Sequence, residues 1–366
     1  MLTRRAALGA LGLAVAVPAT AAWLRPGARD DGAPLRSLAA QKGLLFGAAN
    51  NNYWLKRDDF AAAFARDCAI LVPEYELKRD LTEPSPGTYD FSAADALLAF
   101  SDANGMRFRG HPLVWYASNP PWLDAAILNA RDERIFTDYI DKAASQYRGR
   151  MHSWDVVNEA IEPADGRADG LRDCAWLKRF GPSYIARAFG AAHAADPGAL
   201  LVYNEYGLES DLAGHDARRR AVLKLLESLL AQGAPVGALG LQGHITAFGA
   251  PIDQKKLAAF LDDVRGMGLA ILVTEHDVDD GDGALDIARR DRAVADASRR
   301  MLDVVLDNPA TAAVLTWGLS DLYLEPQSAR DALLRGIPRK LPLDAAMRPT
   351  AMHGAIAQAL KGARER

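Results

Sequence analysis

The sequence predicts a single (β/α)8 TIM barrel, and three observations lead to that fold. Short apolar runs recur along the chain, amphipathic helical stretches separate them, and polar side chains stand where the runs end. Repeated alternation of strand and helix indicates an α/β domain, and eight repeats match a closed parallel barrel. An open doubly wound sheet is the alternative, although no Gly-x-Gly-x-x-Gly follows the first apolar run.

The eight apolar runs are interpreted as the barrel strands. In chain order they are 43–49, 68–73, 106–115, 152–158, 199–204, 236–244, 269–275 and 312–317. Two connecting segments, 218–233 and 253–268, carry apolar residues on one face, as amphipathic helices do. Gly233 marks the expected end of the first of these helices.

The N-terminus predicts an export signal over residues 1–21. Arg4 and Arg5 precede an apolar run over 6–17, and the small residues at 19–21 resemble a signal cleavage site. The paired arginines favour the twin-arginine route. An uncut membrane anchor is the alternative, but the run is short for a membrane span. We therefore expect an exported, periplasmic or secreted protein without stable membrane association.

Residues 22–40 contain two glycines and two prolines and predict a flexible lead-in, so the folded domain is expected over 41–362. The whole chain has 366 residues and a net charge of -4. No basic patch stands out, which argues against nucleic acid as a partner. Nothing in the sequence indicates an oligomer, and we expect a monomer.

Polar and aromatic residues gather where the predicted strands end. They are Glu74, Glu76, His111, Trp115, Asn158, Glu159, Asn204, Glu205, Gln242, His244, Glu275, Asp277, Trp317 and Asp321. The C-terminal strand ends of a barrel share one mouth, so these side chains are expected to converge on one pocket. Such a pocket suits a sugar, because aromatic rings pack on pyranose faces while amides and carboxylates bond the hydroxyls.

Two of these carboxylates fit the requirements for cleaving a glycosidic bond, which needs one protonated and one ionised carboxyl group. Glu159 is predicted to be the acid, because Asn158 beside it could bond a sugar 2-hydroxyl. Glu275 is predicted to be the nucleophile, because His244 and Asp277 could bond it and keep it charged. From position alone, each glutamate could instead cap a solvated loop.

The cysteines and histidines give no clear sign of a metal site. Cys68 opens an apolar run, which favours a buried free thiol over a disulfide with Cys174. No Cys/His spacing resembles a zinc site. A metal-dependent hydrolase that uses His111, His244 and Asp277 is an alternative. The first strand, however, ends in FGAANNN and lacks the pair of histidines that we expect of such an enzyme.

In these strand-end residues the chain resembles glycoside hydrolase family 10, the retaining endo-β-1,4-xylanases, over roughly residues 40–362. WDVVNEA (154–160) resembles the acid/base motif of that family, and LVTEHDV (272–278) resembles its nucleophile motif. Further strand-end motifs are RGHPLVW (109–115), YNEY (203–206), LQGH (241–244) and TWGLSD (316–321).

The resemblance implies residue roles as well as a fold. It implies that Glu159 is the acid/base and Glu275 the nucleophile, with His244 and Asp277 supporting Glu275, and that no cofactor and no metal are needed. The implied substrate-binding residues are Glu74, Lys78, His111, Trp115, Asn158, Asn204, Tyr206, Gln242, His244 and Trp317.

Five positions depart from the family. PEYELKR (73–79) has Tyr75 where the family has an Asn that binds the distal sugar, and Arg79 where it has a Trp. DLYLEPQ (321–327) places Leu324 and Glu325 where a Ser-Trp pair is usual, and Gly207 replaces an Asn. We expect bond cleavage to survive and substrate choice to differ, with an exposed Arg79 and Glu325 at the rim accommodating a charged or decorated xylan.

The implied activity is hydrolysis of internal β-1,4-xylosidic bonds of xylan. A glycosidase of the same fold that acts on a different or decorated β-glycan is one alternative, and a noncatalytic sugar-binding barrel is another. Retention of both Glu159 and Glu275 argues against the noncatalytic barrel, because a binding protein gains little from a buried acid.

Overall fold

The computed structural model describes residues 32–281, 286–324 and 338–366, and of these 33–366 form one compact unit. The predicted export signal therefore lies outside the described residues, as does Glu325. Within the described ranges, no helix combines the length and the apolar content that crossing a membrane requires.

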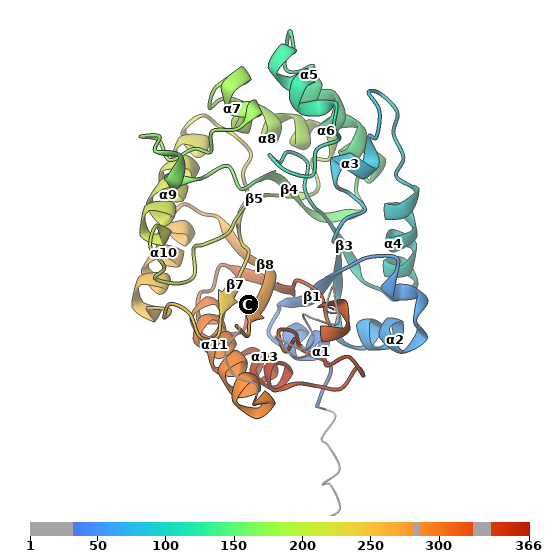
Figure 1. Cartoon of the computed structure of the whole chain (residues 1–366), viewed down its shortest axis with the longest axis vertical. Helices are drawn as coiled ribbons and strands as arrows, with labels where there is room; N and C mark the ends of the chain where they lie inside the picture. Colours follow the sequence, from blue (N-terminus) through green and yellow to red (C-terminus); the bar gives the residue numbers. More distant parts are fainter. Residues whose placement is uncertain (1–31, 282–285, 325–337) are drawn as a thin grey trace, which may run out of the picture. The chain divides into compact units, whose positions relative to one another are not determined.

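Eight parallel strands close into a barrel, as predicted (Figure 1). The strands and a short ninth one are β1 (Leu45–Asn50), β2 (Ile70–Pro73), β3 (Arg107–Gly110), β4 (Met151–Asn158), β5 (Leu200–Glu205), β6 (Ala238–Leu241), β7 (His244–Thr246), β8 (Ala270–Asp279) and β9 (Thr311–Thr316). Neighbours in sequence pair from β1 to β6, β6 pairs with β8, β8 with β9, and β9 with β1 closes the ring.

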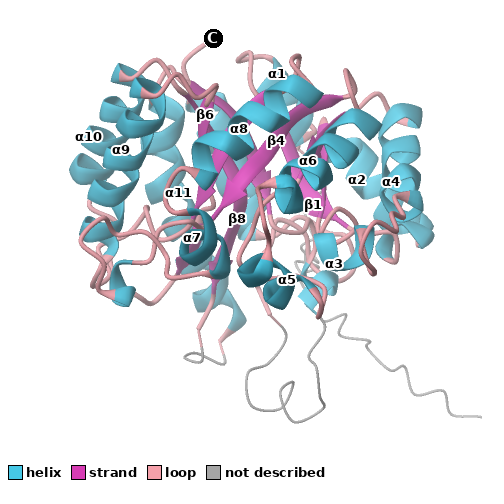
Figure 2. Ribbon diagram, turned by 90° about the horizontal axis from the view of Figure 1, so that it is seen from above, coloured by secondary structure: helices cyan, strands magenta, loops and turns pink. Residues whose placement is uncertain are grey.

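Helices surround this barrel on the outside (Figure 2). They are α1 (Leu35–Ala40), α2 (Asp58–Asp67), α3 (Arg79–Thr82), α4 (Ser92–Ala103), α5 (Leu123–Asn129), α6 (Arg134–Gln146), α7 (Ala175–Phe180), α8 (Tyr184–Ala195), α9 (His215–Ala231), α10 (Gln254–Gly266), α11 (Ile287–Asp307) and α13 (Ala351–Gly362), with 3-10 turns η1 (Trp54–Lys56), η2 (Pro163–Asp165) and η3 (Asp321–Leu324). The two amphipathic segments singled out in the sequence correspond to α9 and α10.

The predicted strand limits need correction at two places. The third strand ends at Gly110 rather than Trp115, because Pro112 has no N–H to donate; the pairing with β4 resumes only as a single bridge at Val114. The sixth run is split in two, because the chain turns at Gly243, where φ is +82°. The second piece, β7, then pairs with the extended end of β8.

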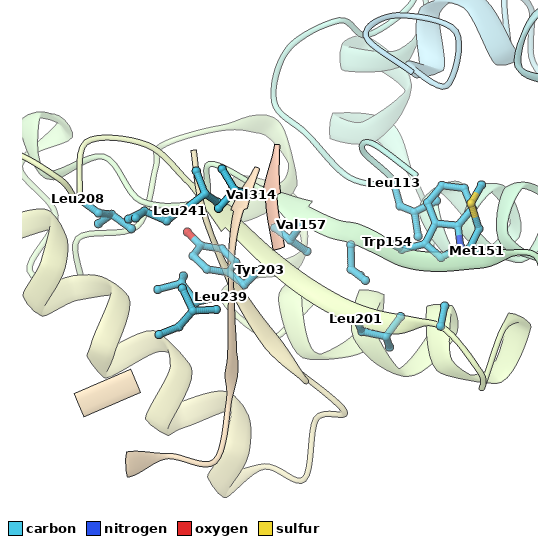
Figure 3. Close-up of a cluster of buried hydrophobic side chains, with 14 of the residues drawn as sticks. Leu113, Met151, Trp154, Val157, Leu201, Tyr203, Leu208, Leu239, Leu241 and Val314 are labelled. Atoms are coloured by element: carbon cyan, nitrogen blue, oxygen red, sulfur yellow. The ribbon is translucent and has the colours of Figure 1, made fainter. Parts of the chain in front are cut away.

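Two apolar clusters fill the domain on either side of the strands. The smaller contains only strand residues and forms the barrel interior: Ala49, Ile70, Val72, Val202, Ala238, Leu272, Ala313 and Leu315. The larger joins the outer strand faces to the helices, and Figure 3 shows part of it, where Tyr203 of β5 lies beside Leu239 of β6. Because side chains alternate along a strand, Asn204 shares the inner face of β5 with Val202.

The predicted flexible lead-in is wrong at its C-terminal end. Residues 35–40 form α1, whose buried Leu35, Leu38 and Ala39 recur at the spacing of one helical face. The backbone N–H of Leu35 also donates to the buried Asp67 carboxylate at 3.1 Å. The compact unit therefore begins at Ala33 instead of residue 41.

Cys68 and Cys174 are both free thiols. Cys68 is fully buried and packs in the larger apolar cluster, as its position in an apolar run predicts. Cys174 is partly buried immediately before α7.

Gly47 on β1 and Gly190 on α8 give a test of how closely the strands pack. A methyl group at position 47 would lie 2.0 Å from the carbonyl oxygen of Ile70, whereas one at position 190 meets nothing within 4 Å. Gly47→Ala is therefore expected to lower the free energy of unfolding by about 3 kcal/mol. Gly190→Ala should raise it by about 0.5–1 kcal/mol through helix propensity. Urea unfolding measures both, and a neutral Gly47→Ala would contradict the strand packing described here.

Candidate active site

An open pocket of about 530 Å³ lies at the carboxyl ends of the barrel strands. Of the predicted site residues it brings together Lys78, His111, Trp115, Asn158, Glu159, Tyr206, Gln242, His244, Glu275 and Trp317. It also contains four residues that the sequence did not single out as site residues: Tyr116, Gly207, Leu212 and His215. We call this the mouth pocket.

Glu159 follows β4 and enters the mouth pocket from a left-handed backbone conformation, with φ at +57°. Its carboxylate accepts hydrogen bonds from Trp115 Nε1 (2.9 Å), Gln242 Nε2 (2.9 Å) and Asn158 Nδ2 (3.2 Å). Its backbone N–H donates to the Asn204 carbonyl oxygen at 2.9 Å, which holds the turn against β5. All three donors to the carboxylate are uncharged groups.

Glu275 on β8 has a different environment. Its carboxylate accepts a hydrogen bond from Asn204 Nδ2 at 2.7 Å, lies 3.3 Å from His244 Nε2, and lies 4.0 Å from His111 Nδ1. Burial alone would raise the pKa of Glu275, but the His244 hydrogen bond, the electrostatic effect of the nearby His111 and His244 rings, and the Asn204 hydrogen bond lower it to about 2. Glu275 is therefore ionised at neutral pH.

His244 bridges two carboxylates. Its Nε2 faces Glu275 at 3.3 Å and its Nδ1 faces Asp277 at 2.8 Å, and the strand register places His244 directly opposite Asp277. Burial works to lower the pKa of His244, but Asp277 first and then Glu275 raise it well above its usual value. Both ring nitrogens therefore donate, one to Glu275 and the other to Asp277.

Asn204 was predicted to bind substrate, and the structure places it behind the mouth pocket instead. Its side chain is fully buried. Its Nδ2 donates to Asn158 Oδ1 (2.9 Å) as well as to Glu275, and its Oδ1 accepts from Thr274 Oγ1 (2.7 Å). Asn204 therefore positions Asn158, on the neighbouring strand β4, and Glu275, on β8, which lies beyond β6.

Lys78, Trp115 and Trp317 form one side of the mouth pocket, which we call the tryptophan wall. The Lys78 ammonium lies 5.2 Å from the Trp115 ring centre and 6.0 Å from that of Trp317. The His111 ring packs edge-on against Trp317, with 5.4 Å between ring centres. Aromatic faces beside a cation and an imidazole suit a pyranose ring with its hydroxyls.

Two predicted contacts near β2 need correction. Glu74 does not line the mouth pocket, and its Oε2 accepts from Asn51 Nδ2 at 2.8 Å. Arg79 was expected at the rim but is buried, because it pairs with Glu83 at 2.8 Å and packs 4.3 Å over the Tyr139 ring. It is therefore not available to bind a charged substrate.

Asp155 is a site residue that the sequence analysis missed. Its carboxylate accepts from Arg109 Nη2 at 2.6 Å and from His111 Nδ1 at 2.9 Å. A carboxylate accepts, so His111 Nδ1 carries a proton. The available signal was a charged residue inside the predicted strand HSWDVVN (152–158), where a structural pairing role is expected.

A second group of missed residues surrounds Tyr206, which lines the mouth pocket. The Tyr206 hydroxyl donates to Glu162 Oε2 (2.7 Å) and accepts from Arg172 Nη2 (3.0 Å). The guanidinium of Arg218 lies 4.1 Å over the Tyr206 ring, and that of Arg172 lies 3.9 Å over the Tyr116 ring. The residues around Tyr206 come from separate segments of the chain and belong to none of the motifs found in the sequence. They are Tyr116, Glu162, Arg172 and Arg218.

The metal-dependent alternative does not fit this arrangement. His111, Asp155 and Glu275 are the described residues whose ligand atoms lie within 4.8 Å of one another. Each of them is already hydrogen-bonded or ion-paired, and Arg109 places a guanidinium against Asp155 where a cation would add repulsion. His244 and Asp277, the other predicted ligands, bond each other.

A closed (β/α)8 barrel that holds two differently supported glutamates in an aromatic-lined mouth belongs to the class of glycoside hydrolases. The family model of glycosyl hydrolase family 10 matches residues 34–358. The chain belongs to this family.

Named relatives and solved structures agree with this assignment. The chain is 32% identical over 294 residues to endo-1,4-beta-xylanase B of Thermotoga neapolitana, covering 79% of this chain and 82% of the relative. It resembles the crystal structure of xylanase 10B from Thermotoga maritima, with a TM-score of 0.77, 30% identity, and coverage of 90% and 98%. Xylanase 10B from Thermotoga petrophila in complex with xylobiose gives a TM-score of 0.77 at 29% identity, with the same coverage.

The charge on His244 can be tested through the pH dependence of activity. His244→Asn removes the cationic donor, so the pKa of Glu275 should rise from about 2 toward its usual value. Ionised Glu275 would then be lost at a higher pH, and the acid limb of the kcat/KM profile should move up by at least about one pH unit. At pH 6 we expect kcat/KM to fall about 10- to 100-fold, the effect of one hydrogen bond to a charged group.

His193, exposed on α8, provides the matched control. His193→Asn should leave the profile where it is. An acid limb that stays in place in His244→Asn would show that His244 does not set the ionisation of Glu275.

Proposed function

We propose that this protein is a retaining endo-β-1,4-xylanase in which Glu159 is the acid/base and Glu275 the nucleophile. One observation carries the proposal: the two carboxylates share one pocket but have opposite surroundings. Glu275 lies against an imidazolium, which favours its ionised form, whereas the donors that the described residues offer to the Glu159 carboxylate are all uncharged. The names of the relatives support xylan as the substrate.

In the first step, a Glu275 carboxylate oxygen attacks the anomeric carbon of the bound sugar. The glycosidic C–O bond breaks as the Glu159 carboxyl group donates its proton to the departing oxygen. A covalent glycosyl-enzyme forms. In the second step, the Glu159 carboxylate takes a proton from a water molecule, whose oxygen attacks the same carbon and releases Glu275. Two inversions leave the original configuration.

The tryptophan wall would hold the sugar whose anomeric carbon reacts. His111 links the tryptophan wall to Glu275, because its ring packs against Trp317 and its Nδ1 lies 4.0 Å from the Glu275 carboxylate. Asn158, beside Glu159, is placed to bond a sugar hydroxyl, and Asn204 fixes its amide. Tyr75, which is 43% exposed and stands where the family has a sugar-binding Asn, favours a changed preference for the distal sugar, such as a different or decorated β-glycan.

We also propose that residues 1–21 direct export and that the enzyme acts as a monomer. Xylan is a polymer that does not cross membranes, so an enzyme that cleaves long chains must meet them outside the cytoplasm. N-terminal sequencing of protein collected outside the cytoplasm tests the signal, and a chain that still begins at Met1 would contradict cleavage.

Glu275→Ala should abolish hydrolysis without unfolding the domain. Loss of the nucleophile removes the covalent step, so kcat on xylan should fall by about 10⁴-fold or more. Release of reducing sugar and thermal unfolding measure activity and fold. Glu227→Ala, at an exposed position on α9, is the matched control and should remain fully active. Unchanged turnover in Glu275→Ala would remove Glu275 from the nucleophile role.

Glu159→Ala should affect substrates according to their leaving groups. Acid assistance matters most when the departing oxygen is basic, so kcat on xylan should fall by about 10²- to 10⁴-fold. The first step on a dinitrophenyl xylobioside, whose leaving group departs as an anion, should change far less. Pre-steady-state release of dinitrophenol measures that step. An equal loss on both substrates would contradict the acid role.

A further inference from the structure

His215 lines the mouth pocket from the first residue of α9, and no role has been assigned to it so far. Its Nδ1 lies 3.1 Å from the Ser210 carbonyl oxygen and 3.2 Å from the Ser210 hydroxyl, which can either donate or accept. A carbonyl oxygen can only accept, so Nδ1 is the protonated nitrogen. Burial lowers the pKa of His215, and the guanidiniums of Arg219 and Arg218 lower it further, so the ring is neutral at pH 7. Nε2 is therefore a hydrogen-bond acceptor.

Gly207 has no side chain that would cover that acceptor. A Cβ at position 207 would lie 3.1 Å from His215 Nε2 and 3.3 Å from Arg218 Nε. The backbone φ of +67° at Gly207 also disfavours most other residues. In the part of the chain that the structure describes, no donor reaches Nε2. His215 Nε2 is thus a hydrogen-bond acceptor that faces the mouth pocket, because the contact at Nδ1 fixes the tautomer of the ring.

The position of His215 indicates which end of the substrate it meets. Tyr206, Gly207, Leu212 and His215 all come from the segment after β5, and we call them the β5 wall. The sugar attacked by Glu275 is assigned to the tryptophan wall, on the side of His111 and Trp317. The β5 wall is then expected to contact the leaving-group sugar, on the other side of the bond that is cleaved.

We propose that His215 Nε2 accepts a hydrogen bond from a hydroxyl group of the leaving-group sugar, which approaches through the space left by Gly207. This inference rests on the proposed function and concerns its substrate class. The favoured leaving group is a pyranose with that hydroxyl free, because a substituted oxygen has no proton to donate. The Asn found here in the family would occupy the space, so the contact is specific to this chain.

The ratio of kcat/KM for xylotetraose to kcat/KM for nitrophenyl xylobioside tests the inference. The nitrophenyl leaving group has no hydroxyl, whereas the sugar leaving group has several. His215→Phe keeps a planar ring without an acceptor and should lower the ratio about 3- to 10-fold, the usual effect of one neutral hydrogen bond. His215→Gln offers an amide oxygen and should restore part of the ratio. His193→Phe, on the exposed face of α8, should leave the ratio unchanged.

Two results would overturn the inference while leaving the proposed function intact: an unchanged ratio in His215→Phe, or a His215→Gln ratio as low as that of His215→Phe. If the Phe variant does not fold, the wild-type enzyme supplies the test, because xylobiosides with deoxygenated leaving sugars should lose the same factor. A wild-type enzyme that cleaves neither substrate would contradict the proposed function and this inference together.

Discussion

The site depends on pairing the charged side chains that are buried at the carboxyl ends of the barrel strands. Arg109 and Asp155 are almost completely buried and pair at 2.6 Å, and Asp155 in turn holds His111 beside Glu275. A buried charge without a partner costs several kcal/mol, so each member of this series stabilises the next. The same reasoning applies on the other side of Glu275, where His244 lies between two carboxylates.

Parallel strands explain how these groups meet. Glu159 follows β4 and Glu275 lies on β8, more than a hundred residues later, yet the barrel directs both strand ends to one mouth. Asn204 of β5 joins them, since one amide bonds both Asn158 and Glu275. The orientation of the acid pair is therefore set by the strands, while the pocket around it is built by loops.

This division explains what the sequence could predict. Alternating apolar runs mark the strands, and polar residues at their ends mark the mouth, so the barrel and most pocket residues follow from local patterns. Burial of Arg79 does not, because it depends on Tyr139 from a distant helix. Asn204 was misjudged for a similar reason: a polar residue at a strand end can face the substrate or stand behind it. Helix α1 was missed because its three buried apolar residues follow directly on a glycine- and proline-containing stretch, which by composition predicts a flexible segment.

The backbone of Glu159 has an evolutionary consequence. At φ +57° a glutamate is strained, whereas glycine, asparagine or aspartate adopts that conformation more readily. Replacements that relieve the turn would also remove or displace the acid, so stability and chemistry oppose each other at this residue. Drift without selection for turnover would favour the relaxed residue and leave a barrel that holds sugars without cutting them. If Glu159 is the acid, as proposed, selection for turnover explains why a glutamate stands at this strained turn.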